Sequence, residues 1–181
     1  MNEAGPLLNM PSLANPHSIL VGQTELQNAE IAQPQVRNLA NQIFGGFLMR
    51  RAYELAYTTA YVFGGARPKF FEVDQVLFSM PVSVGDLTNF HAKVLYTAVK
   101  EELKDFDHFQ GHAQIPLISV EVEAWIIDPK KTLAKLSNQF NFTFALSAGT
   151  SIRKVLPSNT EEARKMAIRM AADKAQEEDY Q

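Results

Sequence analysis

The sequence contains no cysteine among its 181 residues. A disulfide framework, a cysteine nucleophile and a cysteine-bound metal site are therefore excluded. No apolar run approaches the roughly 18 residues that a membrane-spanning helix needs, so we expect no transmembrane segment. Basic residues are too scattered to follow a nucleic-acid backbone: 17 Lys and Arg stand against 20 Asp and Glu, which gives a formal net charge of −3. Nucleic acid is therefore not an expected partner.

The first 20 residues lack Lys and Arg and carry three prolines, Pro6, Pro11 and Pro16. This composition fits neither a secretory signal nor an Arg-rich transit peptide, so no import signal is visible. Proline and polar residues interrupt each short apolar pair, which predicts an extended tail over residues 1 to 22. The remaining chain is long enough for one sizeable core. We therefore expect a single domain over residues 23 to 157, followed by a helix and tail over residues 158 to 181.

The longest helical pattern in the chain covers residues 44 to 63. Apolar residues recur along it near the 3.6-residue period, and a second stripe of Tyr53, Tyr57 and Tyr61 is interpreted as core packing. The following Gly64-Gly65 pair provides the left-handed stop that a helix end commonly needs. Gly45 and Gly46 at the start would expose backbone N–H groups where the helix dipole is positive. The start of this helix is therefore the best candidate for chemistry.

Strand signals surround this helix. Alternation or β-branched and aromatic content marks five segments: residues 23 to 33, 70 to 78, 87 to 99, 115 to 127 and 133 to 146. In the third segment, alternation places Phe90, Ala92, Val94 and Tyr96 on one face and His91 on the polar face. This pattern predicts an antiparallel sheet with one solvated face. A last helix over residues 160 to 174 has only a narrow apolar stripe, so we expect it on the surface.

One long helix wrapped by an antiparallel sheet is the hotdog arrangement. The expected fold class is therefore α+β, with a single hotdog domain and a C-terminal surface helix. The long strand over residues 87 to 99 and its neighbours are expected to leave an exposed sheet edge in a monomer. Because such an edge is usually covered by pairing, we expect an oligomer.

The run from Asn41 to Ala56, which contains Ile43-Phe44-Gly45-Gly46-Phe47-Leu48-Met49-Arg50, resembles the second hotdog domain of the mitochondrial two-domain acyl-CoA thioesterases. The resemblance continues through residues 63 to 68, 73 to 74 and 81 to 85, and it covers roughly residues 23 to 175. It implies binding or hydrolysis of acyl-CoA thioesters in the mitochondrion. It also implies that coenzyme A enters as part of the substrate and that no separate cofactor is needed.

The same resemblance assigns roles at the helix start. It implies that the backbone N–H of Gly46 polarises the thioester carbonyl, with Gly45 beside it, and that Asn41 is the polar residue of the preceding loop. A helix N-terminus suits this role because it offers unpaired donors to a developing oxyanion. The alternative is that both glycines only let the helix pack closely on a strand. Arg67 and Lys69 are candidate contacts for the coenzyme A phosphates, with a solvated turn as the alternative.

The carboxylate of such a site is missing from its expected place. Single-domain bacterial relatives carry an aspartate about one and a half turns after the glycine pair, where this chain has Tyr53, and a tyrosine is a poor base at neutral pH. Glu54 should point elsewhere and pair with Arg50. In the two-domain enzymes, the resemblance implies that the first domain supplies the carboxylate. Asp74, or Glu72, is the candidate substitute here, and a structural carboxylate is the alternative interpretation.

Two functions remain open at this point. The first is an acyl-CoA thioesterase that works as a homodimer or beside another hotdog chain. The second is a non-catalytic hotdog subunit with a structural role in a larger mitochondrial assembly, because the catalytic carboxylate is absent. No metal site is expected, since His108 and His112 lie four residues apart in a loop without a visible third ligand.

Overall fold

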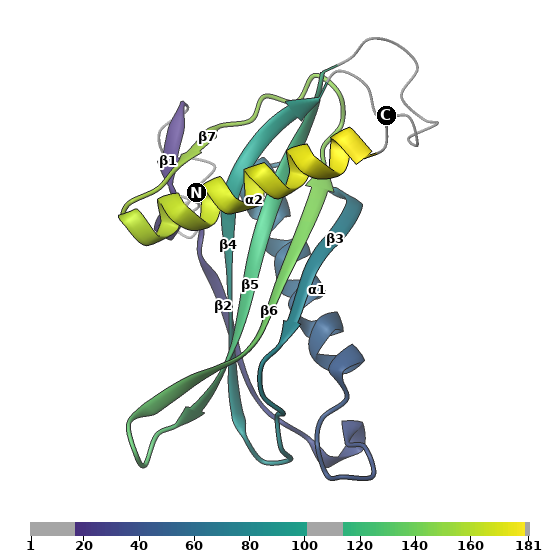
Figure 1. Cartoon of the computed structure of the whole chain (residues 1–181), viewed down its shortest axis with the longest axis vertical. Coiled ribbons are helices and arrows are strands. Elements are labelled where there is room, and N and C mark those ends of the chain that lie inside the picture. Colours follow the sequence, from purple (N-terminus) through teal and green to yellow (C-terminus); the bar gives the residue numbers. More distant parts are fainter. Residues whose placement is uncertain (1–16, 101–113, 180–181) are drawn as a thin grey trace, which may run out of the picture.

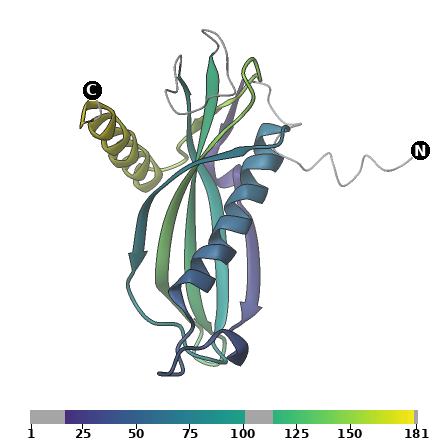
Figure 2. The same ribbon diagram turned by 90° about the vertical axis from the view of Figure 1, so that its right-hand side faces the viewer.

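The computed structural model describes residues 17 to 100 and 114 to 179, and its centre is one long helix against one sheet. Helix α1 (Gly45–Gly64) packs on five antiparallel strands in the order β2-β4-β5-β6-β3. These strands are β2 (Leu26–Ile31), β3 (Lys69–Phe78), β4 (Leu87–Lys100), β5 (Ile115–Asp128) and β6 (Leu133–Ala145). Figures 1 and 2 show the sheet curving along α1. The predicted hotdog fold is confirmed.

Small residues bring α1 close to the sheet. Its buried stripe includes Ala52, Ala56 and Ala60, each with no exposed surface. At the C-terminal end, a Cβ on Gly64 would lie 2.9 Å from Leu146 Cδ1, so any side chain here would force the buried Leu146 to shift. The helix then stops at Gly65, which has a φ of 65° and donates its N–H to the Tyr61 carbonyl at 2.9 Å. This is the left-handed stop that the glycine pair predicts.

The sheet side of the core is aromatic. Phe140, Phe142 and Phe144 alternate along β6 and are all buried in the cluster that packs on α1. Strand alternation therefore places all three phenylalanines on one face, as the sequence predicts. Tyr53 of α1 contacts Phe142 and Phe144 with ring centroids 5.7 and 5.9 Å apart. The interpretation of Tyr53 as core packing fits these contacts.

The expected face of Tyr96 in the strand over residues 87 to 99 is wrong. A β-bulge lies between Val94 and Tyr96, so Val94 pairs with Val120 but Tyr96 pairs with Ser119. Tyr96 therefore lies on the face opposite Val94, because an extra residue reverses the alternation. The expected free sheet edge lies on a neighbour of this strand: β4 is interior, and in the described part of the chain the sheet ends at β2, which pairs with β4, and at β3.

The N-terminal region is more structured near residue 20 than the sequence predicts. Strand β1 (Ser18–Leu20) pairs in parallel with β7 (Lys154–Leu156), and the 3₁₀ turn η3 (Val21–Thr24) connects β1 to β2. The first predicted strand is accordingly shortened to β2. A second 3₁₀ turn, η4 (Pro34–Val36), follows β2. Most of the predicted tail, and the predicted loop with His108 and His112, lie outside the described residues.

Helix α2 (Thr160–Asp179) lies on the sheet face opposite α1, as Figure 2 shows. Asn159 caps it, because its Oδ1 accepts the Glu162 N–H at 2.9 Å. The expected surface helix is confirmed, and it continues beyond residue 174. None of the helices in the described part of the chain is both long and apolar enough to cross a membrane.

Candidate functional site

The start of α1 offers free backbone donors. Phe44 is the N-cap and makes no side-chain cap hydrogen bond. Its carbonyl accepts the N–H groups of Phe47 at 3.0 Å and Leu48 at 3.3 Å. The N–H groups of Gly45 and Gly46 precede these, and the first N–H groups of a helix have no acceptor within it. They point out of the positive end of the helix dipole, which suits an anion or oxyanion.

The two glycines are present for different reasons. A Cβ on Gly45 would lie 2.9 Å from Cε1 of Phe78, so Gly45 allows close packing against β3. A Cβ on Gly46 would meet no atom of the described residues within 4 Å. The packing alternative therefore explains Gly45 but not Gly46. The open space at Gly46 is what a ligand or a partner chain would need to reach the N–H.

A tight loop presents Asn41 just before the helix. Asn38 forms the loop, since its Oδ1 accepts the N–H groups of Ala40 at 2.9 Å and Gln42 at 3.0 Å. Asn41 has a φ of 60°, a left-handed conformation that asparagine tolerates. Its side chain is exposed and accepts a hydrogen bond from Arg37 Nη1 at 3.3 Å. Asn41 and Gly46 thus come from one continuous segment, as predicted.

Sequence reasoning missed Asn38 and Arg37. The available signal was the polar run before the helix, because asparagine side chains commonly hydrogen-bond to the backbone two residues further on. A neighbouring turn also supports the loop: the Val84 N–H donates to the Asn41 carbonyl at 3.4 Å. In that turn the Asp86 carboxylate accepts the Ser83 N–H at 2.8 Å. The Asp86 carboxylate therefore caps the turn that supports the Asn41 loop.

Asp74 does not join this site within one chain. Its Oδ2 lies 2.5 Å from Arg169 Nη2 and 3.5 Å from Thr143 Oγ1, and its side chain is only 4% exposed. Arg169 belongs to α2, so Asp74 faces the sheet surface opposite α1. Glu72, the other candidate, pairs with Thr143 in the register of β3 and β6 and lies on the same side. The structural-carboxylate interpretation of Asp74 is the one that this geometry supports.

Three carboxylates lie close together between β3 and α2. Ligand atoms of Glu72, Asp74 and Asp173 lie within 4.8 Å of one another. Arg169 Nη2 also lies 2.5 Å from Asp173 Oδ1, so one guanidinium pairs with two of the three carboxylates. Arginine is the usual partner for buried carboxylates because its planar group presents several donors. We assign no metal to this cluster.

Tyr53 and Glu54 both lie in contacts that leave neither as a general base. Tyr53 is half-buried among aromatic rings, including Phe70 at a centroid distance of 5.7 Å. Glu54 pairs with Arg50 at 3.0 Å, as predicted, and also with Arg51 at 3.0 Å. The hydrogen bond from Arg50, outweighing partial burial, lowers the pKa of the Glu54 carboxyl. Glu54 is therefore a weak base engaged with two cations.

Arg67 and Lys69 are exposed at the opposite end of α1 from Gly46. With 20 residues in the helix and a rise of about 1.5 Å per residue, the two ends lie roughly 30 Å apart. Arg67 and Lys69 therefore lie far from Gly46 within a single chain, and their contact with the coenzyme A phosphates stays a prediction. Only a long ligand or a second chain could bring such contacts together.

An apolar strip runs along the side of the molecule where α1 meets the free edge of β3. Its exposed members, here called the β3 strip, are Phe44 (56% exposed), Met49 (37%), Tyr61 (46%), Phe70 (44%), Val73 (41%) and Phe78 (56%). Exposed apolar side chains beside a strand edge that has no partner in the described part of the chain are typical of a protein interface. The helix start with Gly45 and Gly46 lies at one end of this strip.

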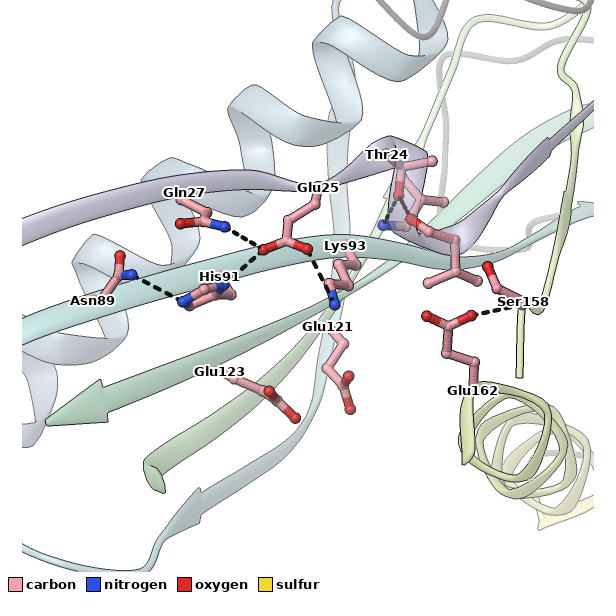
Figure 3. Close-up of polar contacts among 12 residues, drawn as sticks. Thr24, Glu25, Gln27, Asn89, His91, Lys93, Glu121, Glu123, Ser158 and Glu162 are labelled. Atoms are coloured by element: carbon pink, nitrogen blue, oxygen red, sulfur yellow. Dashed lines mark hydrogen bonds and ion pairs between the residues drawn. The ribbon is translucent and has the colours of Figure 1, made fainter. Parts of the chain in front are cut away.

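A second group of polar residues lies on the other sheet face. Figure 3 shows His91 between Glu25 and Asn89, with distances of 2.7 Å and 2.9 Å from its ring nitrogens. His91 is thus partly buried and hydrogen-bonded, whereas the sequence predicts simple exposure. Lys165 of α2 pairs with Glu121 at 2.9 Å and with Glu123 at 2.6 Å. A pocket of about 200 Å³ lies here, and its lining residues of both charge signs include Glu121, Glu123 and Lys165.

The ionisation of Glu25 makes the stability of the fold depend on pH. Burial opposes its ionisation, but hydrogen bonds from His91, Lys93 and Gln27 outweigh burial and lower the pKa of the carboxyl from 4.5. A lowered folded-state pKa stabilises the protein above the unfolded-state value, and this stabilisation is lost as the pH falls through the folded-state pKa. We expect Glu25→Gln to flatten the decline of the free energy of unfolding below pH 4.5. Urea unfolding from about pH 6 to pH 3 measures this slope.

The control is Glu161→Gln, because the Glu161 side chain is 62% exposed and forms only a surface pair with Arg164. Such pairs contribute little to stability. An unchanged slope in Glu25→Gln would show that the Glu25 contacts do not carry the acid sensitivity.

The chain is similar in sequence to proteins that are named acyl-coenzyme A thioesterases. No family model matches the chain. It is 44% identical over 172 residues to acyl-coenzyme A thioesterase 2, chloroplastic, of Humulus lupulus, covering 91% of this chain and 37% of that protein. It is 43% identical over 170 residues to acyl-coenzyme A thioesterase 4, mitochondrial, of the same plant, covering 91% and 30%. The chain therefore spans about a third of the length of these curated relatives.

Solved structures share the fold. An apo-hexameric acyl-CoA thioesterase superposes with a TM-score of 0.72 at 18% identity, covering 91% of this chain and 97% of that one. At this identity the likeness establishes the hotdog architecture alone.

Proposed function

We propose that this chain provides the oxyanion-binding half of an acyl-CoA thioesterase site. The observation that carries the proposal is the open helix start at Gly46, whose N–H stands in the first helical turn, where no acceptor is available within the helix, next to the exposed Asn41. The resemblance of this segment to thioesterases, and the names of the relatives, supply the substrate class. Coenzyme A would enter only as part of the substrate, and no cofactor is invoked.

The proposed reaction is hydrolysis of the thioester. Water attacks the carbonyl carbon, and the carbonyl electron pair moves onto oxygen, where the Gly46 N–H donates to the oxyanion. The C–S bond then breaks, and the proton lost by water reaches the departing sulfur, which leaves coenzyme A and a carboxylic acid. A general base is required to remove that proton. Among the described residues, Asp74, Glu54 and Asp86 are all engaged elsewhere, so we assign the base to a partner domain.

The β3 strip is the surface where that partner would pair. Its free strand edge and exposed side chains begin at the helix start, so a second hotdog domain placed there could bring a carboxylate to Gly46. The hexameric state of the solved thioesterase is consistent with this arrangement. The partner is proposed to be a second copy or another hotdog chain.

We expect the protein to sediment as a dimer or larger species rather than as a 20.2 kDa monomer. Val73→Lys should yield monomers, because a lysine in an edge strand opposes pairing. Analytical ultracentrifugation at micromolar concentration tests this. Leu133→Lys is the matched control, since Leu133 is 50% exposed in the hairpin away from β3. A monomeric wild-type protein would remove the proposed partner surface.

The alternative function is a non-catalytic hotdog subunit of a larger assembly. The packing of Tyr53 among aromatic rings and the pairing of Asp74 with Arg169 favour it, because neither position supplies a base. The curated relatives are named mitochondrial or chloroplastic, so we propose an organellar location, with the mitochondrion implied by the resemblance. The two functions differ in whether any turnover is detectable.

The test is hydrolysis of acyl-CoA substrates of graded chain length by the purified chain, followed with a thiol-reactive dye. Because the protein has no cysteine, the dye reports only released coenzyme A. Because a second copy of this chain brings the same engaged carboxylates, we expect slow turnover by the purified chain, which Asn41→Gly reduces by about a further 100-fold. Glycine is chosen because it tolerates the left-handed conformation of residue 41. Absence of turnover at every chain length would favour the non-catalytic subunit.

A further inference from the structure

The loop before α1 fixes which end of the Asn41 amide is available. The only hydrogen bond of the Asn41 side chain within the described residues joins it to Arg37 Nη1 at 3.3 Å. A guanidinium has donors and no acceptor, so the atom that faces it must be Oδ1. The orientation of the amide therefore follows from its partner, and Nδ2 with its two N–H groups points away from Arg37.

Backbone contacts hold this geometry from both sides. The Asn38 N–H donates to the Gln42 carbonyl at 2.7 Å, and Asn38 Oδ1 accepts two N–H groups of the loop. Arg37 and Ile43 form an antiparallel bridge across the base of the loop, and Gln42 forms another with Ser83. Residues 37 to 43 are thus a closed loop in which Arg37 lies opposite the start of the helix segment.

We infer that Arg37 and Asn38 are positioning residues for Asn41, and that they make its Nδ2 amide group a hydrogen-bond donor to the thioester. This inference rests on the proposed function and assigns the chemical role of Asn41 within it. A donor would share the oxyanion with the Gly46 N–H, whereas an acceptor would orient the attacking water. The hydrogen bond from the Arg37 guanidinium uses one of the two lone pairs of Oδ1 and polarises the amide, which makes its Nδ2 group a better donor and so favours the donor role.

Asn41→Asp separates the two roles. Aspartate has nearly the same shape, tolerates positive φ and keeps the contact with Arg37, but it has no N–H donor at neutral pH. We expect kcat of Asn41→Asp to fall about as far as that of Asn41→Gly, on the order of 100-fold. Turnover that is retained or increased in Asn41→Asp would overturn the donor role.

Arg37→Met tests the positioning role, because methionine keeps an apolar stem and removes the donors. We expect kcat to fall about tenfold with KM changed less than about twofold. Arg37→Lys should recover part of the loss. On the Asn41→Gly background, Arg37→Met should have no further effect, since Arg37 acts through Asn41. An equal loss on both backgrounds, or a rise in KM alone, would overturn this role. Arg164→Met is the control, because Arg164 is 68% exposed on α2.

Nuclear magnetic resonance separates failure of this inference from failure of the proposed function. If the wild-type chain hydrolyses no acyl-CoA, the proposed function fails and the donor role fails with it. The contact itself is then decided by the side-chain NH₂ resonances of Asn41. They should shift in Arg37→Met and in Asn38→Ala but not in Arg164→Met. Unchanged resonances in both loop variants would overturn the positioning of Asn41.

Discussion

Gly46→Pro is expected to lower kcat for acyl-CoA hydrolysis by about 100- to 1,000-fold, the loss typical of removing one oxyanion donor. Proline deletes the backbone N–H without a side chain that could replace it. The helix should survive, because proline is accepted in the first turn, where the N–H has no intrahelical acceptor. The position is also open, with no described atom within 4 Å of an added Cβ. Steady-state kinetics with the thiol-reactive dye measures the effect.

Gly46→Ala is the matched control for this experiment. Alanine adds a Cβ in the same open space but keeps the N–H, so turnover should stay within a few-fold of wild type. Circular dichroism and the melting temperature verify that both variants fold. If Gly46→Ala loses as much activity as Gly46→Pro, the added Cβ rather than the loss of the N–H causes the defect. Gly46 would then be needed to leave space for the substrate or a partner chain. If neither loses activity, the helix start is not the oxyanion site.

Arg169→Met is expected to destabilise the fold by about 3–5 kcal/mol, because removing one partner of a buried ion pair leaves an uncompensated charge. Asp74 and Arg169 have side chains only 4% and 9% exposed. Asp173 would lose the same partner, since it lies 2.5 Å from Arg169. Chemical unfolding gives the free energy directly, with Arg164→Met as the exposed control. That control should change stability by less than about 1 kcal/mol.

The Arg169 experiment also decides between the two interpretations of Asp74. If Asp74 is structural, Arg169→Met should unfold more easily, and Asp74→Asn should leave kcat unchanged once the variant is folded. If Arg169→Met is as stable as wild type, the ion pair does not hold Asp74 in place. Loss of turnover in folded Asp74→Asn would then return this carboxylate to the catalytic site, through contact with a second chain.

The sequence predicts the long elements well because their periodicity is strong. The 3.6-residue period of α1 and the alternation of Phe140, Phe142 and Phe144 survive in the structure with nearly the expected bounds. The β-bulge of β4 leaves no signal in the alternation of residues 90 to 96, so the sequence places Tyr96 on the wrong face of the sheet. Strand order is likewise absent from local patterns, so the sequence predicts a free edge among residues 87 to 99 and their neighbours without showing that it lies on β2. Strands of three residues, such as β1 and β7, are too short for a periodic signal.

The site was only partly predictable. Asn41 and Gly46 come from one continuous segment, so the resemblance of that segment identifies them together. The pairing of Asp74 with Arg169 joins residues far apart in sequence, and no local pattern indicates it. Arg67 and Lys69 lie at the far end of α1 from Gly46, which follows from the 20-residue length of the helix. The contact of Arg37 with Asn41 requires the left-handed loop geometry, which the sequence alone does not provide.

The small residues beneath α1 constrain how this protein can change over evolutionary time. Ala52, Ala56, Ala60 and Gly64 set the distance between helix and sheet, and a larger side chain at any of them would lift one end of α1. Because α1 is a rigid rod, lifting its C-terminal end would tilt the Gly46 N–H at the other end. Divergence is therefore expected at exposed positions of the same helix, such as Arg50 and Thr58, while the buried row remains restricted to the smallest side chains.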